Sequence, residues 1–206
     1  MSHSDFKTEA LPGLPEELPE GEDILWQGRP NAWRLAWDAM WLKWIAIYFA
    51  ALIIWRVVAS WGAMSPVNAL GTALPLVILA LVITVLIYGL AVAQSRATLY
   101  TITSARVVMR IGLAFTMTIN LPFSRISSAD LAVNKDGTGT IAFTPKDGTR
   151  MAITMLWPHY RSWHSRHPQP ALRCISDAAA VAKFVGEAAK TTQAQPQVST
   201  FAEAMA

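Results

Sequence analysis

An uninterrupted run of 39 residues, 57–95, contains no Asp, Glu, Lys or Arg. A helix that crosses the hydrocarbon core of a bilayer needs only about 20 predominantly apolar residues. The second half of the run is the clearer helix, because Pro75 stands where the first helical turn tolerates the loss of an amide donor. The sequence therefore predicts a transmembrane helix over about residues 73–94.

A second apolar segment, 39–60, precedes this run and carries Lys43 and Arg56 near its two ends. Long basic side chains near a helix end can extend their charges toward the interface, so both are compatible with a span. The connection between the segments holds turn-forming and helix-breaking residues, namely Gly62, Ser65, Pro66, Asn68 and Gly71. Residues 39–95 are therefore predicted to form a two-helix transmembrane hairpin.

Basic residues predict the orientation of this hairpin. Arg56 is the one basic residue beside the connection, whereas six flank the outer ends of the spans: Arg29, Arg34, Lys43, Arg96, Arg106 and Arg110. Because cytoplasmic flanks are enriched in Lys and Arg, we expect a multi-pass protein of the inner (cytoplasmic or intracytoplasmic) membrane with both termini in the cytoplasm. Residues 1–25 are acidic and proline-rich without a long apolar core, so we expect no cleaved signal peptide.

Residues 1–38 are predicted to form an acidic cytoplasmic arm, with eight acidic and three basic residues, that ends in the start of an interfacial helix. Asn31 is a candidate N-cap, and tryptophans follow it at near-helical spacing. Two interpretations stay open and are compatible: an aromatic belt at the membrane interface, and a stripe that docks a partner. The candidate contact residues are Trp26, Arg29, Trp33, Arg34, Trp37, Trp41 and Trp44.

The chain after the hairpin changes from helical to alternating periodicity, which is typical of half-buried strands. Six short strands separated by turn residues are predicted, at 98–103, 106–111, 115–121, 126–133, 139–144 and 150–156. A linker over 157–173 and an amphipathic helix that starts near Ser176 or Asp177 and closes the sheet follow. We expect one domain over 97–190, built as a meander or barrel, and a flexible polar tail over 191–206.

Residues 100–143, YTITSARVVMRIGLAFTMTINLPFSRISSADLAVNKDGTGTIAF, resemble the bacterial pleckstrin-homology (bPH) pattern of a tyrosine strand, a P-F-S-R-I corner and a glycine turn. With the upstream ILWQGRP and the segment WPHYRSWHSRHPQPALRCISDAAAVAKFV at 157–185, the chain is similar to the photosynthetic complex assembly proteins of purple phototrophic bacteria. The resemblance implies an α+β membrane protein with a pleckstrin-homology-like β-barrel or sandwich capped by the C-terminal helix. It also implies a role in assembling the photosynthetic reaction centre with its core light-harvesting complex (LH1).

Residue patterns that carry chemistry are sparse. No catalytic or phosphate-loop motif is present, so we expect no enzyme activity. His159, His164 and His167 do not match a structural zinc pattern, and Cys174 is the only cysteine, so we expect no metal site. Residues 39–95 contain no histidine to bind a pigment magnesium, and we expect no cofactor.

Eleven basic and six acidic residues give 97–206 an excess of positive charge. Three explanations compete: a solvated face beside an anionic leaflet, a lipid-headgroup site, and, least favoured without a recognised motif, nucleic-acid binding. The candidate headgroup residues are Arg106, Arg110, Arg161 and Arg166.

The preferred hypothesis is a non-enzymatic assembly factor that contacts antenna and reaction-centre polypeptides, membrane lipid and a second copy of itself. Its spanning helices would pack directly against client helices. The alternative hypothesis is a membrane-tethered module that binds anionic headgroups.

Overall fold

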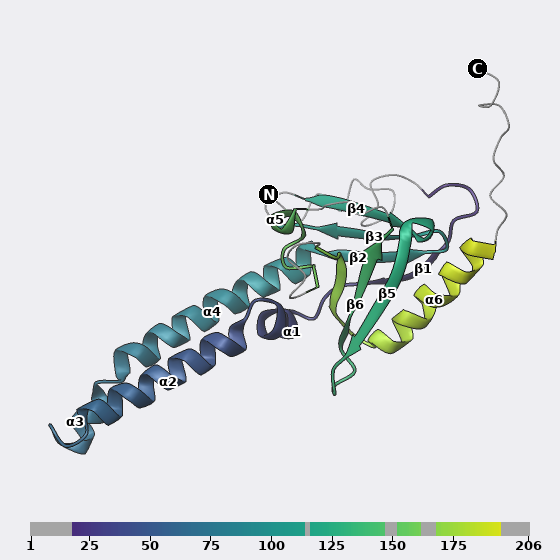
Figure 1. The fold of residues 1–206 in the computed structure, drawn as a ribbon. Coiled ribbons are helices and arrows are strands. Elements are labelled where there is room, and N and C mark those ends of the chain that lie inside the picture. Colours follow the sequence, from purple (N-terminus) through teal and green to yellow (C-terminus); the bar gives the residue numbers. More distant parts are fainter. Residues whose placement is uncertain (1–17, 114–115, 147–151, 162–167, 195–206) are drawn as a thin grey trace, which may run out of the picture.

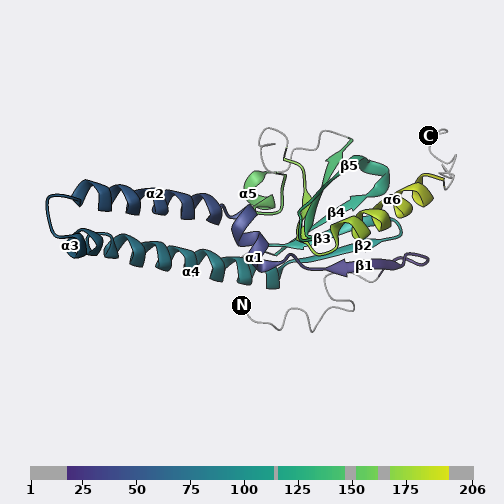
Figure 2. The same cartoon turned by 90° about the horizontal axis from the view of Figure 1, so that it is seen from below.

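The computed structural model describes residues 18–113, 116–146, 152–161 and 168–194, and it places two antiparallel sheets at one end of a long helical hairpin (Figure 1). The hairpin consists of α2 (Leu42–Ser60), a short α3 (Pro66–Gly71) at its tip and α4 (Leu74–Ala97). The two long helices run side by side in both ribbon views (Figure 2). Both are long and apolar enough to cross a membrane, by length and composition.

The chain enters the hairpin through a broken helical segment instead of the continuous helix that the tryptophan spacing predicts. Asn31 is the N-cap of α1 (Ala32–Arg34), as predicted, and its side-chain oxygen accepts a hydrogen bond from the Arg34 amide at 3.1 Å. A π-helical turn, η1 (Leu35–Ala39), follows, and Trp41 then adopts a left-handed backbone with φ of 63°. These irregularities delay the first long helix to Leu42, three residues after the predicted start.

Within the described residues, seven strands form two sheets. The first has the order β1-β2-β3-β4, with β1 (Ile24–Gly28), β2 (Leu99–Thr103), β3 (Arg106–Ile111) and β4 (Met117–Pro122). A 3₁₀ turn, η2 (Phe123–Arg125), leads to the second, with the order β5-β6-β7: β5 (Ile126–Val133), β6 (Gly139–Pro145) and β7 (Ala171–Ile175). Five of the six predicted strands are thus confirmed, with ends shifted by at most two residues.

The sixth predicted strand, 150–156, is wrong. Residues 153–156 form a short helix, α5 (Ile153–Leu156), and 150–151 lie outside the described residues. The last described strand, β7, begins within the segment predicted as a linker and extends two residues beyond it. All five β7 residues are buried, so the strand lacks the alternation of polar and apolar residues on which the prediction relied.

β1 pairs with β2 although the whole hairpin separates them in the sequence, with Gly28 opposite Tyr100 and Gln27 opposite Thr101. The Gln27 side chain also donates to the Thr101 hydroxyl at 2.9 Å, between residues 74 positions apart. Residues predicted to belong to a separate arm therefore form the edge strand of the first sheet. The chain leaves this sheet after β1, forms the hairpin and re-enters the sheet in β2, the strand next to β1.

The main core lies between the two sheets and α6 (Ala178–Ala194), which packs along their open side (Figure 1). Its largest fully buried side chains include Tyr100, Phe123 and Phe143. The predicted apolar face of the last helix is buried here through Ala178, Val181 and Val185. The mixed α and β architecture, with two antiparallel sheets and a packed C-terminal helix, agrees with the predicted pleckstrin-homology-like domain.

Candidate functional site

A second, smaller apolar cluster joins the hairpin to the domain. Its buried members come from η1, the ends of α2 and α4, and β7: Leu35, Ala36, Ala39, Met40, Leu42, Ala91 and Cys174. The Asn31 amide donates to the Cys174 carbonyl at 2.7 Å, and the Ser95 hydroxyl donates to the Pro30 carbonyl at 2.5 Å. Both ends of the hairpin are thus attached to the domain at this junction.

Arg173 is a buried cation at the junction that the sequence analysis did not single out. Its guanidinium donates over 3.4–3.5 Å to the carbonyl oxygens of Asp38, Pro158 and Tyr160, and its Nε atom has no partner among the described residues. A charge removed from water is tolerated only when other groups replace its hydration. These carbonyls do so, and they tie β7 to η1. An arginine within the otherwise apolar run ALRCI is the feature that could have indicated it.

A chain of charged groups runs over the outside of the same junction. The Asp38 carboxylate lies 3.6 Å from the Lys43 ammonium and 3.7 Å from the Arg34 guanidinium, which in turn lies 2.6 Å from Asp136. Asp136 belongs to the turn between β5 and β6. The Thr138 hydroxyl and then Arg34 donate to it, and these bonds lower the pKa of the Asp136 carboxyl.

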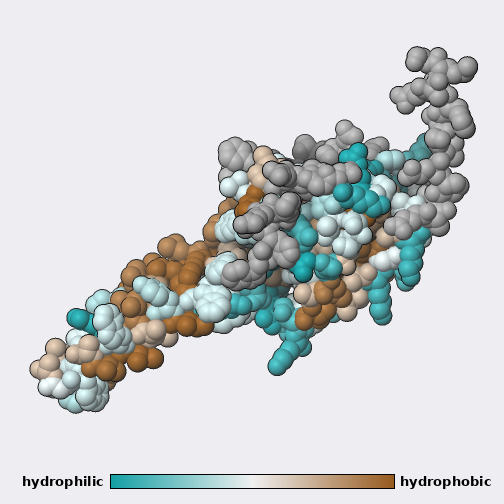
Figure 3. Space-filling view, viewed as in Figure 1, coloured by the Kyte–Doolittle hydropathy of each residue, from teal (hydrophilic) through white to brown (hydrophobic). Residues whose placement is uncertain are grey.

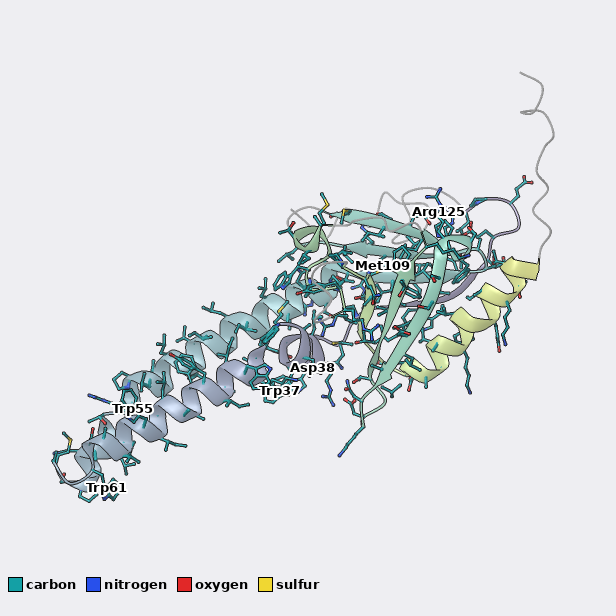
Figure 4. The ribbon with its side chains drawn as sticks, in the orientation of Figure 1. Trp37, Asp38, Trp55, Trp61, Met109 and Arg125 are labelled. Atoms are coloured by element: carbon teal, nitrogen blue, oxygen red, sulfur yellow. The ribbon has the colours of Figure 1, made fainter. Side chains whose placement is uncertain are left out.

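The predicted contact tryptophans divide into two groups. Trp26, in the middle of β1, packs against the main core of the domain and not against the hairpin. Trp33 stacks on Trp37 with ring centroids 5.7 Å apart and meets Tyr88 of α4 edge-on at 5.9 Å. Figure 4 shows Trp37 and Asp38 at the end of α2 nearest the sheets.

Three of these tryptophans, near the start of the hairpin, are exposed. Trp33, Trp41 and Trp44 are 53%, 46% and 54% exposed. The remaining two predicted contact residues are cations: Arg34 is engaged as described above, and Arg29 is exposed and has an interaction within the chain.

His159 is a buried structural histidine and not a ligand or an accessible base. It is completely buried, its Nδ1 lies 2.6 Å from the Tyr100 hydroxyl, and its Nε2 lies 3.1 Å from the Thr98 hydroxyl. Burial, and then the nearby Arg173 charge, lower the pKa of His159 to about 3. His164 and His167 lie outside the described residues, within which no group of three or more metal-ligating side chains occurs.

The predicted headgroup arginines do not gather into one cationic pocket within the described residues. The Arg106 guanidinium bonds both carboxylate oxygens of Glu22, at 2.7 and 2.5 Å, and this bond lowers the pKa of Glu22. Arg161 bonds the Asp130 carboxylate, and Arg110 is buried with interactions of its own. Arg166 lies outside the described residues, so the headgroup site stays a prediction.

A groove of about 230 Å³ lies between β5 and α6. Ile126, Leu131 and Val185 are among the apolar residues that line it, and Ser127 and Ser128 supply its only polar side chains. Because no titratable side chain lines the groove, it suits apolar contact and offers no acid, base or metal ligand.

Comparison with known proteins relates the chain to one family. The model described as "Bacterial PH domain" matches residues 35–189, which include the hairpin and every strand except β1. A protein of Rhodobacter capsulatus named "Uncharacterized 23.7 kDa protein in puhA 5'region" is 44% identical over 203 residues, covering 96% of this chain and 94% of the relative. No solved structure matches the chain.

Proposed function

We propose, on the premise that the chain belongs to the bacterial PH domain family, that it is a non-enzymatic, membrane-anchored assembly factor of the PuhB type. Its clients would be polypeptides of the photosynthetic reaction centre and of LH1. The name of the Rhodobacter capsulatus relative, which refers to the region 5' of the reaction-centre gene puhA, supports this choice of clients.

The exposure of the hairpin is the observation that carries the proposal. Only 11% of the most apolar window of α2, and 6% of that around α4, is buried by the chain itself. Hydrophobic side chains predominate on the face of the hairpin that Figure 3 shows. Monomeric soluble proteins rarely expose contiguous apolar patches larger than a few hundred Å², so lipid or client helices must cover this surface.

The β1–β2 pairing supports a hairpin whose two ends lie on one side of the membrane. An even number of spans satisfies this pairing, since the strand before the hairpin and the strand after it share a sheet. The basic residues at these ends favour the cytoplasmic side. We therefore propose a multi-pass protein of the inner membrane with its domain in the cytoplasm.

Small side chains offer places where a client helix can approach closely, as in other membrane helix pairs. Gly89 of α4 is the clearest, because a Cβ atom added there meets no atom within 4 Å and the hairpin's own packing does not need this glycine. Ala46, Ala50 and Ala51 on α2 and Ala80 and Thr84 on α4 are further small residues along the two helices.

Photo-crosslinking in cells that build the complex tests the proposal. A photoreactive residue in place of Leu86, which is 65% exposed on α4, should capture an antenna or reaction-centre polypeptide during assembly. The same residue at Phe184, 39% exposed on α6, is the matched control and should capture none of their membrane segments. Normal rates of complex formation in cells without the protein would refute the proposed role.

The second candidate function is binding of anionic headgroups, which the positive charge of 97–206 favours. The test uses the full chain, because a fragment starting at residue 97 would lack β1. Arg161→Gln with Arg166→Gln should weaken recruitment of anionic vesicles to the detergent-solubilised chain, and salt should weaken it too. Salt-independent or absent recruitment would exclude this function.

A further inference from the structure

Three large apolar side chains are exposed at the end of the domain that faces the hairpin. Leu113, in the loop after β3, is 45% exposed, Met155 of α5 is 60% exposed, and Trp157 directly after α5 is 40% exposed. We call these three residues the apolar rim. Leu113 and the other two residues come from chain segments about 40 residues apart, one after β3 and the other at α5.

The strand register places Leu113 beside the hairpin. Leu99 starts β2 two residues after α4 ends, and it lies opposite Arg110 near the end of β3. The loop that follows β3 therefore emerges next to the C-terminal end of α4.

A hydrogen bond places Trp157 at the same end. His159, two residues further on, bonds through Nε2 to the hydroxyl of Thr98, which is the C-cap residue of α4. Figures 1 and 2 agree that α5 lies at the end of the domain next to the hairpin.

This end of α4 has the composition of a membrane interface. The apolar run of α4 stops at Ala93 and is followed by Gln94, Ser95 and Arg96, of which Arg96 is exposed. Exposed tryptophans already flank the hairpin where α2 begins, at Trp41 and Trp44. Tryptophan favours the headgroup level, where its ring is partly apolar and its N–H can stay hydrated.

We infer that the apolar rim rests in the interfacial layer of the bilayer that holds the hairpin, so that the domain itself contacts the membrane. This inference rests on the proposed anchoring of the hairpin. The bilayer is the occupant that the position favours, because the rim adjoins the helix end from which the spans enter the membrane and contains no charged side chain. The rim therefore extends the surface formed by Trp41 and Trp44 onto the domain.

The contact would fix how the domain is tilted. A contact to one side of the hairpin axis would add a second point of attachment to the membrane, beside the junction that holds the hairpin and the domain together. In this arrangement α6 leads away from the membrane, because it starts near the junction, where the Ala178 amide donates to the Gly137 carbonyl, and ends at the end of the domain farthest from the hairpin (Figure 2).

A depth measurement on the full chain in lipid vesicles tests the inference. Met155→Cys is labelled with an environment-sensitive fluorophore, and quenching by spin labels at the headgroup is compared with quenching by spin labels deep in the acyl chains. Phe184→Cys on α6 is the matched control, and Ile54→Cys, 63% exposed within α2, reports on the span. Cys174 stays in place because it is buried, and the unsubstituted chain shows whether it takes up label.

The label at position 155 should be quenched severalfold more by headgroup spin labels than the label at 184, and the label at 54 should be quenched by the deep ones. Quenching at 155 no greater than at 184, with position 54 quenched, would overturn the inference and leave the anchoring intact. A label at 54 that no lipid quenches would refute the anchoring, and the inference with it.

Discussion

The hairpin and the domain are both rich in large apolar side chains, but the domain buries them and the hairpin exposes them. In the domain, Phe143 and Ile141 are 0% and 1% exposed, because two sheets and α6 enclose them. In the hairpin, Trp55 and Leu86 are 70% and 65% exposed, although they stand in regular helices. The same chemical property therefore stabilises one region through its own packing and makes the other depend on what surrounds it.

Polar groups show the same division. The domain and the junction bond most of theirs internally, as in the contacts of His159 and of the terminal guanidinium nitrogens of Arg173, whereas α2 and α4 carry few polar side chains. A helix satisfies its own backbone hydrogen bonds, which is why it can stand without neighbours in a solvent that offers none. The difference teaches that the domain has its own core, whereas the hairpin leaves most of its apolar side chains without packing partners among the described residues.

The largest effect is expected in the main core. Phe143→Ala should lower the free energy of unfolding by about 3–5 kcal/mol, because it removes a fully buried ring and leaves a cavity. Phe184→Ala, on the exposed face of α6, should stay within about 0.5 kcal/mol. Chemical denaturation of the purified chain in detergent measures both, and equal losses would contradict the enclosed core described here.

A charge in the hairpin should produce the next largest effect. Leu81→Arg, at a site 63% exposed in α4, should reduce membrane integration. Arginine at the centre of a span makes the free energy of insertion less favourable by about 2.5–3.5 kcal/mol. Phe184→Arg is the control for charge on an exposed surface and should integrate normally. Membrane fractionation with alkaline extraction measures integration, and equal extraction of both variants would show that α4 faces water.

Acid should weaken the domain through His159. Its folded-state pKa of about 3 lies below its unfolded value of about 6.5, so the unfolded chain binds the extra proton first and stability falls as the pH decreases from 6.5 toward 3. Between pH 6.5 and 5 the loss should be about 2 kcal/mol. Thermal melts across this range should slope in the parent and flatten in His159→Gln, and an unchanged slope in the variant would exclude His159 as the cause.

The smallest of these effects concerns the ion pair that joins Glu22, two residues before β1, to Arg106 at the start of β3. Glu22→Gln should cost about 1–2 kcal/mol, because it weakens the charge-assisted bonds to Arg106. The depressed pKa of Glu22 places the corresponding acid loss below its ordinary value of 4.5, and so below the interval from pH 6.5 to 5 in which the effect of His159 is measured. Glu20→Gln, at an exposed site, is the matched control in the same unfolding measurement, and an equal loss in both variants would show that the pair contributes nothing.

Local patterns predicted much of this fold and little of its junction. Uninterrupted apolarity located α2 and α4, and alternation with turn residues located β2 to β6, because each of these depends on residues that are neighbours in sequence. The alternation pattern did not predict β7, because this strand is buried on both faces. It did not predict that β1 belongs to the first sheet, because the partner strand β2 follows the hairpin in the sequence.

The candidate site divides in the same way. Trp33, Trp41 and Trp44 are exposed near the start of the hairpin, where their spacing in the sequence placed candidate contact residues. The bonds of Arg173 to Asp38 and of Arg34 to Asp136 join residues more than 100 positions apart, and no local pattern indicates such a pair.

The pairing of β1 with β2 also constrains the order in which the protein can be made. β1 leaves the ribosome first but has no partner until the entire hairpin and then β2 have been synthesised. Contacts between residues far apart in the chain form only after the intervening segment is positioned. If the hairpin enters the bilayer as it emerges from the ribosome, β1 pairs with β2 only afterwards. A fully folded domain then indicates that both spans have been inserted.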